Sequence, residues 1–142
     1  MKKSYAQAVQ VSLSLVGICV FIGWLGYFYL RLPHFSGSVV KSIELISAGT
    51  PVAKETITQQ TACTKIFESL KSARLSSDTP GTALGELVIH FDNGSTDKLN
   101  ILQHQDGKIF SYQHRGALFQ MPEEQWSNAL REAGVGGQSR MR

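Results

Sequence analysis

The sequence predicts an α+β protein in which one N-terminal transmembrane helix precedes a small antiparallel-sheet domain packed by two helices, in the order β-α-β-β-β-α. Three observations predict this class. Residues 9–30 form an apolar run without a charged side chain. The dipeptides Asn93-Gly94 and Asp106-Gly107, both strong hairpin signals, separate three segments that are predicted as strands. Two segments with helical spacing of apolar residues flank those hairpins.

The apolar run is long enough to cross a bilayer. At about 1.5 Å of rise per residue it spans roughly 33 Å, against about 30 Å for a hydrocarbon core. A cleaved signal peptide or a lipoprotein signal also starts with basic residues, here Lys2 and Lys3, before an apolar run. However, this run exceeds the usual signal length, no small-x-small cleavage site follows it, and Ile18 before Cys19 is not small. We therefore predict an uncleaved anchor.

Composition and charge then suggest an organisation and an orientation. Lys2 and Lys3, with the terminal amine, outweigh Arg31 and Lys41 on the other side of the span, which favours a cytoplasmic N-terminus and a domain outside. A bacterial inner membrane or a plasma membrane fits this arrangement. The predicted segments are a cytoplasmic head at 1–7, the transmembrane helix at 8–31, a linker at 32–38, an extracytoplasmic domain at 39–133 and a disordered tail at 134–142.

The charge distribution argues against nucleic-acid binding. The chain has 14 basic and 11 acidic residues and a net charge of +3. Removing Lys2, Lys3 and Arg31, which flank the span, leaves 11 basic residues against the same 11 acidic ones. The domain is therefore neutral on balance and has no basic excess with which to neutralise phosphates.

The first half of the domain is predicted as strand, helix and loop. Residues 39–47 are rich in β-branched side chains and predict a strand. Thr56 and Gln59 have the spacing of a capping box, which predicts a helix from there to about Arg74. The polar segment 75–85, which contains Pro80-Gly81, predicts a loop.

The second half is predicted as a meander and a closing helix. Strands are expected at 86–91, 97–104 and 108–114, and a short extended piece at 117–120 adds a possible sheet edge. Pro122 opens the last helix, with Glu123 and Glu124 in its first turn, where the helix dipole favours anions. The acidic pair is explained by this dipole more simply than by catalysis.

The hydrophobic pattern also predicts the strand register. A two-residue loop at Asp106-Gly107 places Ile101 opposite Tyr112. A three-residue loop, Asp92-Asn93-Gly94 with Gly94 left-handed, brings the apolar side chains of the first hairpin onto the same face. We therefore expect one buried face, covered by the two helices.

The register separates the histidines. His90 is expected opposite Thr96, eight residues or roughly 26 Å from His104, while His114 falls on the other face. They cannot share a metal ion within this sheet. We predict surface histidines, no metal site and no cofactor.

The remaining motifs point away from catalysis. Cys63 lies on the apolar face of the predicted helix and is expected to be a core residue, with an intermolecular disulfide or a reactive thiol as alternatives. No phosphate loop, nucleophile elbow or Cys-x-x-Cys motif occurs in the sequence. Asn93-Gly94-Ser95 fits a glycosylation acceptor, but the turn explains the same residues.

One pattern in the apolar run suggests a partner. Ser12, Val16, Cys19, Gly23 and Gly26 recur at steps of four and three residues and form one stripe along a helix. Small residues such as Ser12, Cys19, Gly23 and Gly26 let two helix backbones approach closely. The stripe predicts association with another membrane protein or with a second copy of this chain.

Two functions from different classes remain. A helix followed by an antiparallel meander resembles cystatin-like and PepSY-like modules in outline, and such a likeness implies no function. We expect a non-enzymatic, single-pass membrane protein, in contact with the lipid bilayer, whose domain is a protein- or peptide-binding accessory module. The alternative is a membrane-tethered hydrolase or small-ligand sensor with its site at the sheet rim and loop 75–85.

Overall fold

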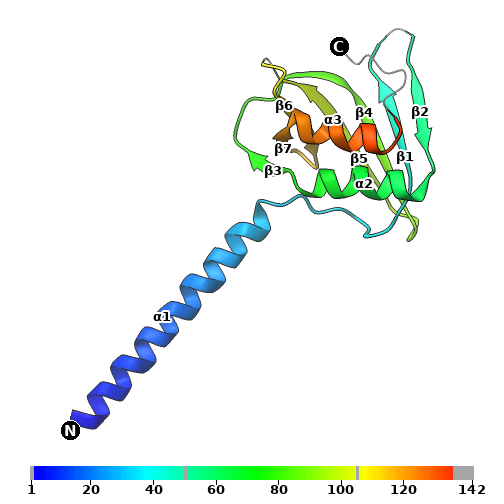
Figure 1. The fold of residues 1–142 in the computed structure, drawn as a ribbon. Coiled ribbons are helices and arrows are strands. Elements are labelled where there is room, and N and C mark those ends of the chain that lie inside the picture. Colours follow the sequence, from blue (N-terminus) through cyan, green and yellow to red (C-terminus); the bar gives the residue numbers. More distant parts are fainter. Residues whose placement is uncertain (1, 50, 105, 136–142) are drawn as a thin grey trace. The chain divides into compact units, whose positions relative to one another are not determined.

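The computed structural model describes residues 2–49, 51–104 and 106–135, and the side chains of those from residue 9 onward. The chain forms two compact units, Met1–Arg31 and Leu32–Arg142. Strands and helices combine as in an α+β protein with an apolar N-terminal helix (Figure 1), which confirms the α+β part of the prediction. Of the predicted tail at 134–142, residues 136–142 lie outside the described part of the chain.

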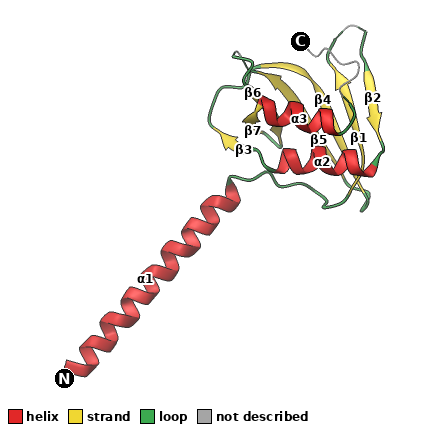
Figure 2. Ribbon diagram, viewed as in Figure 1, coloured by secondary structure: helices red, strands yellow, loops and turns green. Residues whose placement is uncertain are grey.

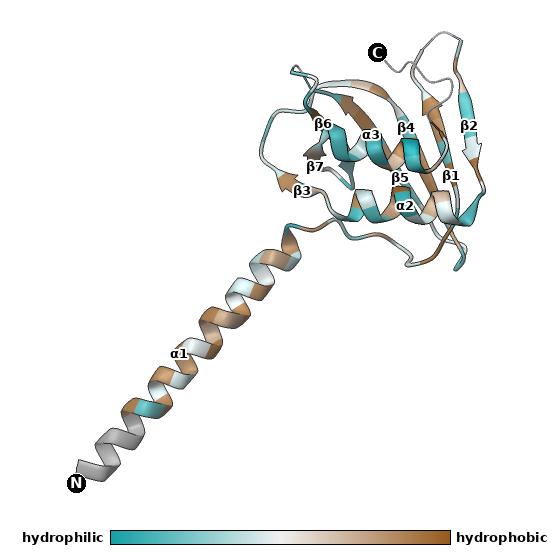
Figure 3. Ribbon diagram, viewed as in Figure 1, coloured by the Kyte–Doolittle hydropathy of each residue, from teal (hydrophilic) through white to brown (hydrophobic). Residues whose placement is uncertain are grey.

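The first unit is a single helix, α1 (Lys2–Leu30). Its segment Val9–Leu30 is largely apolar (Figure 3), with a mean hydropathy of 2.0. None of the residues of this segment is buried. No proline interrupts this segment. The helix ends where the amide of Arg31 donates to the carbonyl oxygen of Phe28 at 3.2 Å, two residues before Pro33. By length and composition, this helix can cross a membrane.

The second unit is an antiparallel sheet with two helices on one face (Figure 2). Its described strands have the spatial order β2-β1-β4-β5-β6-β7-β3. The elements are β1 (Val40–Ser47), β2 (Lys54–Ile57), α2 (Gln60–Lys71), β3 (Arg74–Ser76), β4 (Thr82–Phe91), β5 (Thr96–Gln103), β6 (Ile109–His114), β7 (Ala117–Pro122) and α3 (Glu123–Glu132).

One hydrophobic core lies between the sheet and the two helices. Alternate residues of the strands point into it, and the apolar faces of α2 and α3 close it. The hydroxyl of Tyr112, which is fully buried, donates to the carbonyl oxygen of Leu70 at 2.8 Å and so ties β6 to α2. The largest buried side chains include Tyr112, Ile43, Ile66, Leu70, Leu87, Ile89 and Leu99.

Both predicted registers are confirmed. Leu87 pairs with Leu99 across the β4–β5 hairpin, and Ile101 pairs with Tyr112 across the β5–β6 hairpin. Gly94, at φ 82°, is left-handed as the three-residue loop requires. The hydrophobic pattern was therefore sufficient to set the pairing, because a shift of one residue would turn the apolar side chains to the other face.

The prediction for the first half of the domain was wrong at three points. Thr56 lies in β2 rather than capping a helix, because Ile57 pairs with Ile43 and is buried beside it. Helix α2 accordingly starts at Gln60 and ends at Lys71, before the predicted Arg74. The predicted loop 75–85 contains part of β3 and the first residues of β4.

The end of the meander also differs from the prediction. The piece expected at 117–120 as a possible edge is the six-residue strand β7, which lies inside the sheet between β6 and β3. The order β-α-β-β-β-α therefore lacked three strands. Two of them, β2 and β3, are short strands at the two edges of the sheet, where few side chains are buried and alternation is weak.

Candidate functional site

A buried carboxylate, that of Asp97, forms the centre of a polar site in the domain. Asp97 lies on β5 in phase with Leu99 and Ile101, so its side chain points to the helix-covered face, and it is only 4% exposed. Ser36 meets it there: its amide donates to Asp97 Oδ2 at 2.6 Å and its hydroxyl donates to Asp97 Oδ1 at 2.7 Å. Ser36, which precedes β1 in the chain, is thus held against β5.

Two basic side chains complete this site. Arg115 lies in the turn between β6 and β7 at φ 51°, and its Nη2 donates to Asp97 Oδ1 at 3.2 Å and to Ser36 Oγ. His114 precedes it on the buried face of β6, with Nε2 3.5 Å from Asp97 Oδ1. We call Ser36, Asp97, His114 and Arg115 the Asp97 cluster.

The chain around Ser36 is packed against the domain, and we call residues 33–37 the docked segment. Pro33 is buried. The ring of Phe35 stacks on His114, with centroids 5.1 Å apart and planes 17° apart, and meets Phe67 of α2 edge-on at 5.0 Å. A Cβ at Gly37 would collide with the ring of Phe91, so only glycine fits there.

The charges of the Asp97 cluster are set by burial and by neighbours. Burial raises the pKa of Asp97, but the hydrogen bonds from Ser36, together with His114 and Arg115, outweigh it, and the net shift is downward. Burial lowers the pKa of His114 more than Asp97 raises it, and Arg115 lowers it further. At neutral pH the cluster therefore holds an ionised carboxylate beside a neutral imidazole, whose Nε2 has no hydrogen-bond partner among the described residues.

The meeting of serine, histidine and aspartate does not have the geometry of a catalytic triad. In a triad the imidazole lies between the hydroxyl and the carboxylate and accepts the serine proton. Here the carboxylate of Asp97 is in the middle, since both Ser36 Oγ and His114 Nε2 face its Oδ1. His114 is also 3% exposed and covered by Phe35. The cluster is arranged to hold a chain segment in place.

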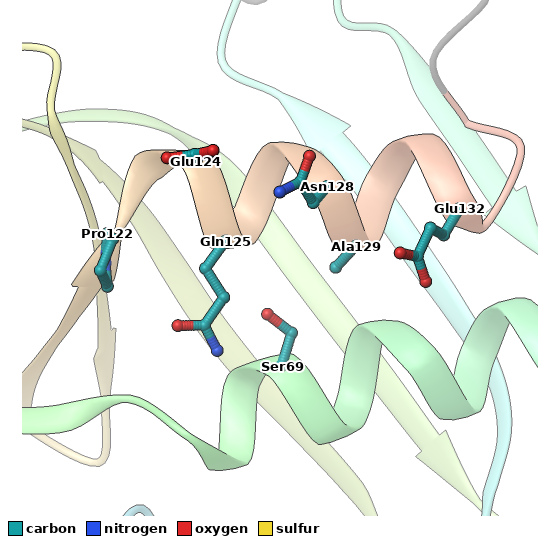
Figure 4. Close-up of a pocket in the computed structure, with 7 residues that line it drawn as sticks. All are labelled: Ser69, Pro122, Glu124, Gln125, Asn128, Ala129 and Glu132. Carbon is teal, nitrogen blue, oxygen red and sulfur yellow. The ribbon is translucent and has the colours of Figure 1, made fainter.

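A second feature is a groove between α2 and α3, of about 400 Å³ (Figure 4). Gln125 reaches from α3 towards α2 and donates to Ser72 Oγ, while Glu132 pairs with Lys65 at 3.2 Å. The acidic pair of the first turn lies close by: Glu123 accepts from Ser127 Oγ at 3.2 Å, and burial raises its pKa. The lining residues are Ser69, Pro122, Glu124, Gln125, Asn128, Ala129 and Glu132.

The histidines are distributed as the register predicted, but one of them is not on the surface. His90 pairs with Thr96, and its partly exposed ring lies 3.6 Å from Glu44. His104 is partly exposed beside Asp106 at 2.9 Å. The prediction of a surface position was wrong for His114, because alternation from Tyr112 turns it to the buried face. Across the described residues, no three His, Cys, Asp or Glu side chains gather as metal ligands would.

The other predicted residues have simple positions. Cys63 is fully buried and its Sγ donates to the carbonyl oxygen of Ile57 at 3.3 Å, which confirms a core role. Asn93 donates to the carbonyl oxygen of Ser36 at 3.1 Å, and its own Oδ1 accepts from Ser95, so its side chain also holds the docked segment. The stripe residues Ser12, Val16, Cys19, Gly23 and Gly26 are exposed along α1, and their helix–helix contact stays a prediction.

Sequence reasoning missed the Asp97 cluster, although part of the signal was present. Asp97 is in phase with Leu99 and Ile101, and His114 is in phase with Phe110 and Tyr112, so the confirmed register already turned both to the core. A carboxylate at a core position needs a partner. Nothing in the sequence indicated that this partner is Ser36, 61 residues away.

Comparison of the chain with protein-family models, with curated proteins and with solved structures finds no match.

Proposed function

We propose that this chain is a single-pass membrane protein whose α+β domain lies outside the cytoplasm and binds a protein or peptide as an accessory module. The observation that carries the anchoring is the segment Val9–Leu30, in which no residue is buried. Leaving apolar surface in water costs roughly 25 cal/mol per Å², and a hydrocarbon core about 30 Å thick removes that cost. Lys2 and Lys3 support the cytoplasmic position of the N-terminus.

The groove between α2 and α3 supports a binding role. Gln125 and Asn128 present amides, and Glu124 and Glu132 present carboxylates, around a space that is open to solvent. Side chains of this kind form hydrogen bonds with peptide groups and with basic side chains.

We expect an impermeant maleimide to label the domain in intact cells. The reporter is Val52→Cys, at a position 67% exposed in the turn between β1 and β2, in a Cys19→Ser background. Cys63 is fully buried and stays unlabelled in the folded chain. The matched variant, Ser4→Cys in the same background, should label only after lysis. The reverse pattern would overturn the orientation, and a mature chain lacking α1 would overturn the anchoring.

We also expect a partner to co-purify with the native chain extracted from its own membranes in mild detergent. Asn128→Arg places a large side chain in the groove. It should lower the amount of partner recovered at least about tenfold, which corresponds to 1.4 kcal/mol of binding free energy. Ser127→Arg is the control, since Ser127 is exposed on the same helix and does not line the groove. The groove would be rejected as the binding site if both variants recovered equal amounts of partner, or if no partner co-purified in stoichiometric amount with the native chain.

A further inference from the structure

The docked segment lies directly after the apolar helix in the chain. Helix α1 ends at Leu30, and Pro33 is the first buried residue of the domain. Only three Cα–Cα steps join them, which reach at most about 11 Å. If the segment left its site, the first anchored residue would be Val40 of β1, and ten steps would reach roughly 33–36 Å.

We propose that the docked segment is a releasable tether: it keeps the free chain between α1 and the domain short while Phe35 and Ser36 are in place, and it opens more often, and so lengthens, when His114 is protonated. The tether's effect on distance from a bilayer rests on the anchoring proposed above. Release itself is a property of the domain and does not depend on the membrane.

The contacts of the segment explain why it can be released as a unit. Its hold on the domain includes one aromatic side chain, Phe35, and the groups of Ser36 that meet Asp97, Arg115 and Asn93. These contacts join the segment to two turns, to the ends of β5 and β6, and to α2. The paired core strands β4, β5 and β6 do not include residues 33–37, so their ladders remain intact when the segment leaves.

His114 couples this release to pH. The charged groups acting on it are Asp97 of β5 and Arg115 of the following turn; the docked segment faces it with Phe35, and α2 contributes Phe67, which has Lys71 Nζ 5.5 Å from its ring centre. Departure of Phe35 admits water to the imidazole, so its pKa returns towards the ordinary 6.5. The open form then binds the proton more tightly than the docked form, and acid favours opening.

The direction in which pH shifts the docking equilibrium follows from proton linkage. Because the docked state depresses the pKa of His114, the docked form is fully stabilised above about pH 6.5 and loses that stability as the pH falls through the lower, docked value. Through the single proton on His114, the opening equilibrium changes by no more than about tenfold per pH unit. Asp97 acts in the same direction, but only at much lower pH, since its pKa is below the ordinary carboxyl value.

The test uses the full chain in detergent micelles. Hydrogen exchange of the Ser36 amide, which donates to Asp97, is measured by NMR and corrected for the intrinsic rate at each pH. We expect its protection to fall about threefold or more between about pH 7.5 and pH 5.5. His114→Gln should abolish this dependence. His104→Gln, which changes a partly exposed histidine paired with Asp106, should preserve it.

The native chain alone also decides the matter if His114→Gln fails to fold. The pH midpoint at which the His114 imidazole resonances shift should coincide with the pH midpoint at which the Ser36 amide loses protection. Protection that does not change with pH, midpoints that differ, or pH dependence that survives His114→Gln would each overturn the proposal. Reversed maleimide labelling would instead reject only the orientation, because exchange in micelles is independent of sidedness.

Discussion

Replacing Asp97 with asparagine is expected to lower the free energy of unfolding of the α+β domain by about 2–4 kcal/mol. The carboxylate is 4% exposed and accepts from two groups of Ser36 and from Arg115. An asparagine of the same size has only one acceptor oxygen, and its amide would turn a donor towards other donors. The loss is large because Asp97 itself is buried, so water does not replace the hydrogen bonds that asparagine fails to make with Ser36.

The matched control is Asp106→Asn. Asp106 also pairs with a histidine, His104 at 2.9 Å, and accepts the amide of Lys108 at 3.0 Å, but its side chain is 45% exposed. Water replaces those contacts, so its unfolding midpoint in urea should stay close to that of the native chain. If the two variants unfold alike, burial is not what makes Asp97 important.

The sequence was most informative where turn residues and alternation agreed. Gly94 and Gly107 mark the two hairpins, and the apolar pattern then leaves one register for β4, β5 and β6. The edges were less predictable for a physical reason. A short edge strand such as β2 buries only Ile57, so a capping pattern at Thr56 looked equally good. Tertiary pairing with β1 decided between the two.

The Asp97 cluster was predictable only in part. Register turns Asp97 and His114 inward, and that much follows from neighbouring apolar residues. The partner could not be found in the same way, because Ser36 lies in a segment whose Pro33 and Gly37 are typical of a flexible linker. Glycine stands at position 37 for another reason than flexibility, because the ring of Phe91 leaves no space for a side chain there. Local composition cannot reveal such a contact across the fold.

The docked segment should make a large difference to the stability of the isolated domain. We expect a fragment beginning at Leu32 to be more stable than one beginning at Ser38 by about 3 kcal/mol, from the burial of Phe35 and the hydrogen bonds to Asp97. For a domain of this size the difference lowers Tm by roughly 10 °C or more. Calorimetry or circular dichroism on both fragments measures it.

Point variants of the longer fragment show which contacts are responsible. Phe35→Ala combined with Ser36→Ala should reproduce most of the loss, because it removes the aromatic contact with His114 and the hydroxyl bond to Asp97 while the chain keeps its length. Ser38→Ala, at an exposed position just after the segment, should leave Tm unchanged. Equal stability of the two fragments would mean that residues 33–37 are a passive linker and that Asp97 is satisfied without them. A lower Tm for the fragment that begins at Ser38 would mean that the folded domain begins at Pro33, so that only two residues separate it from the end of α1.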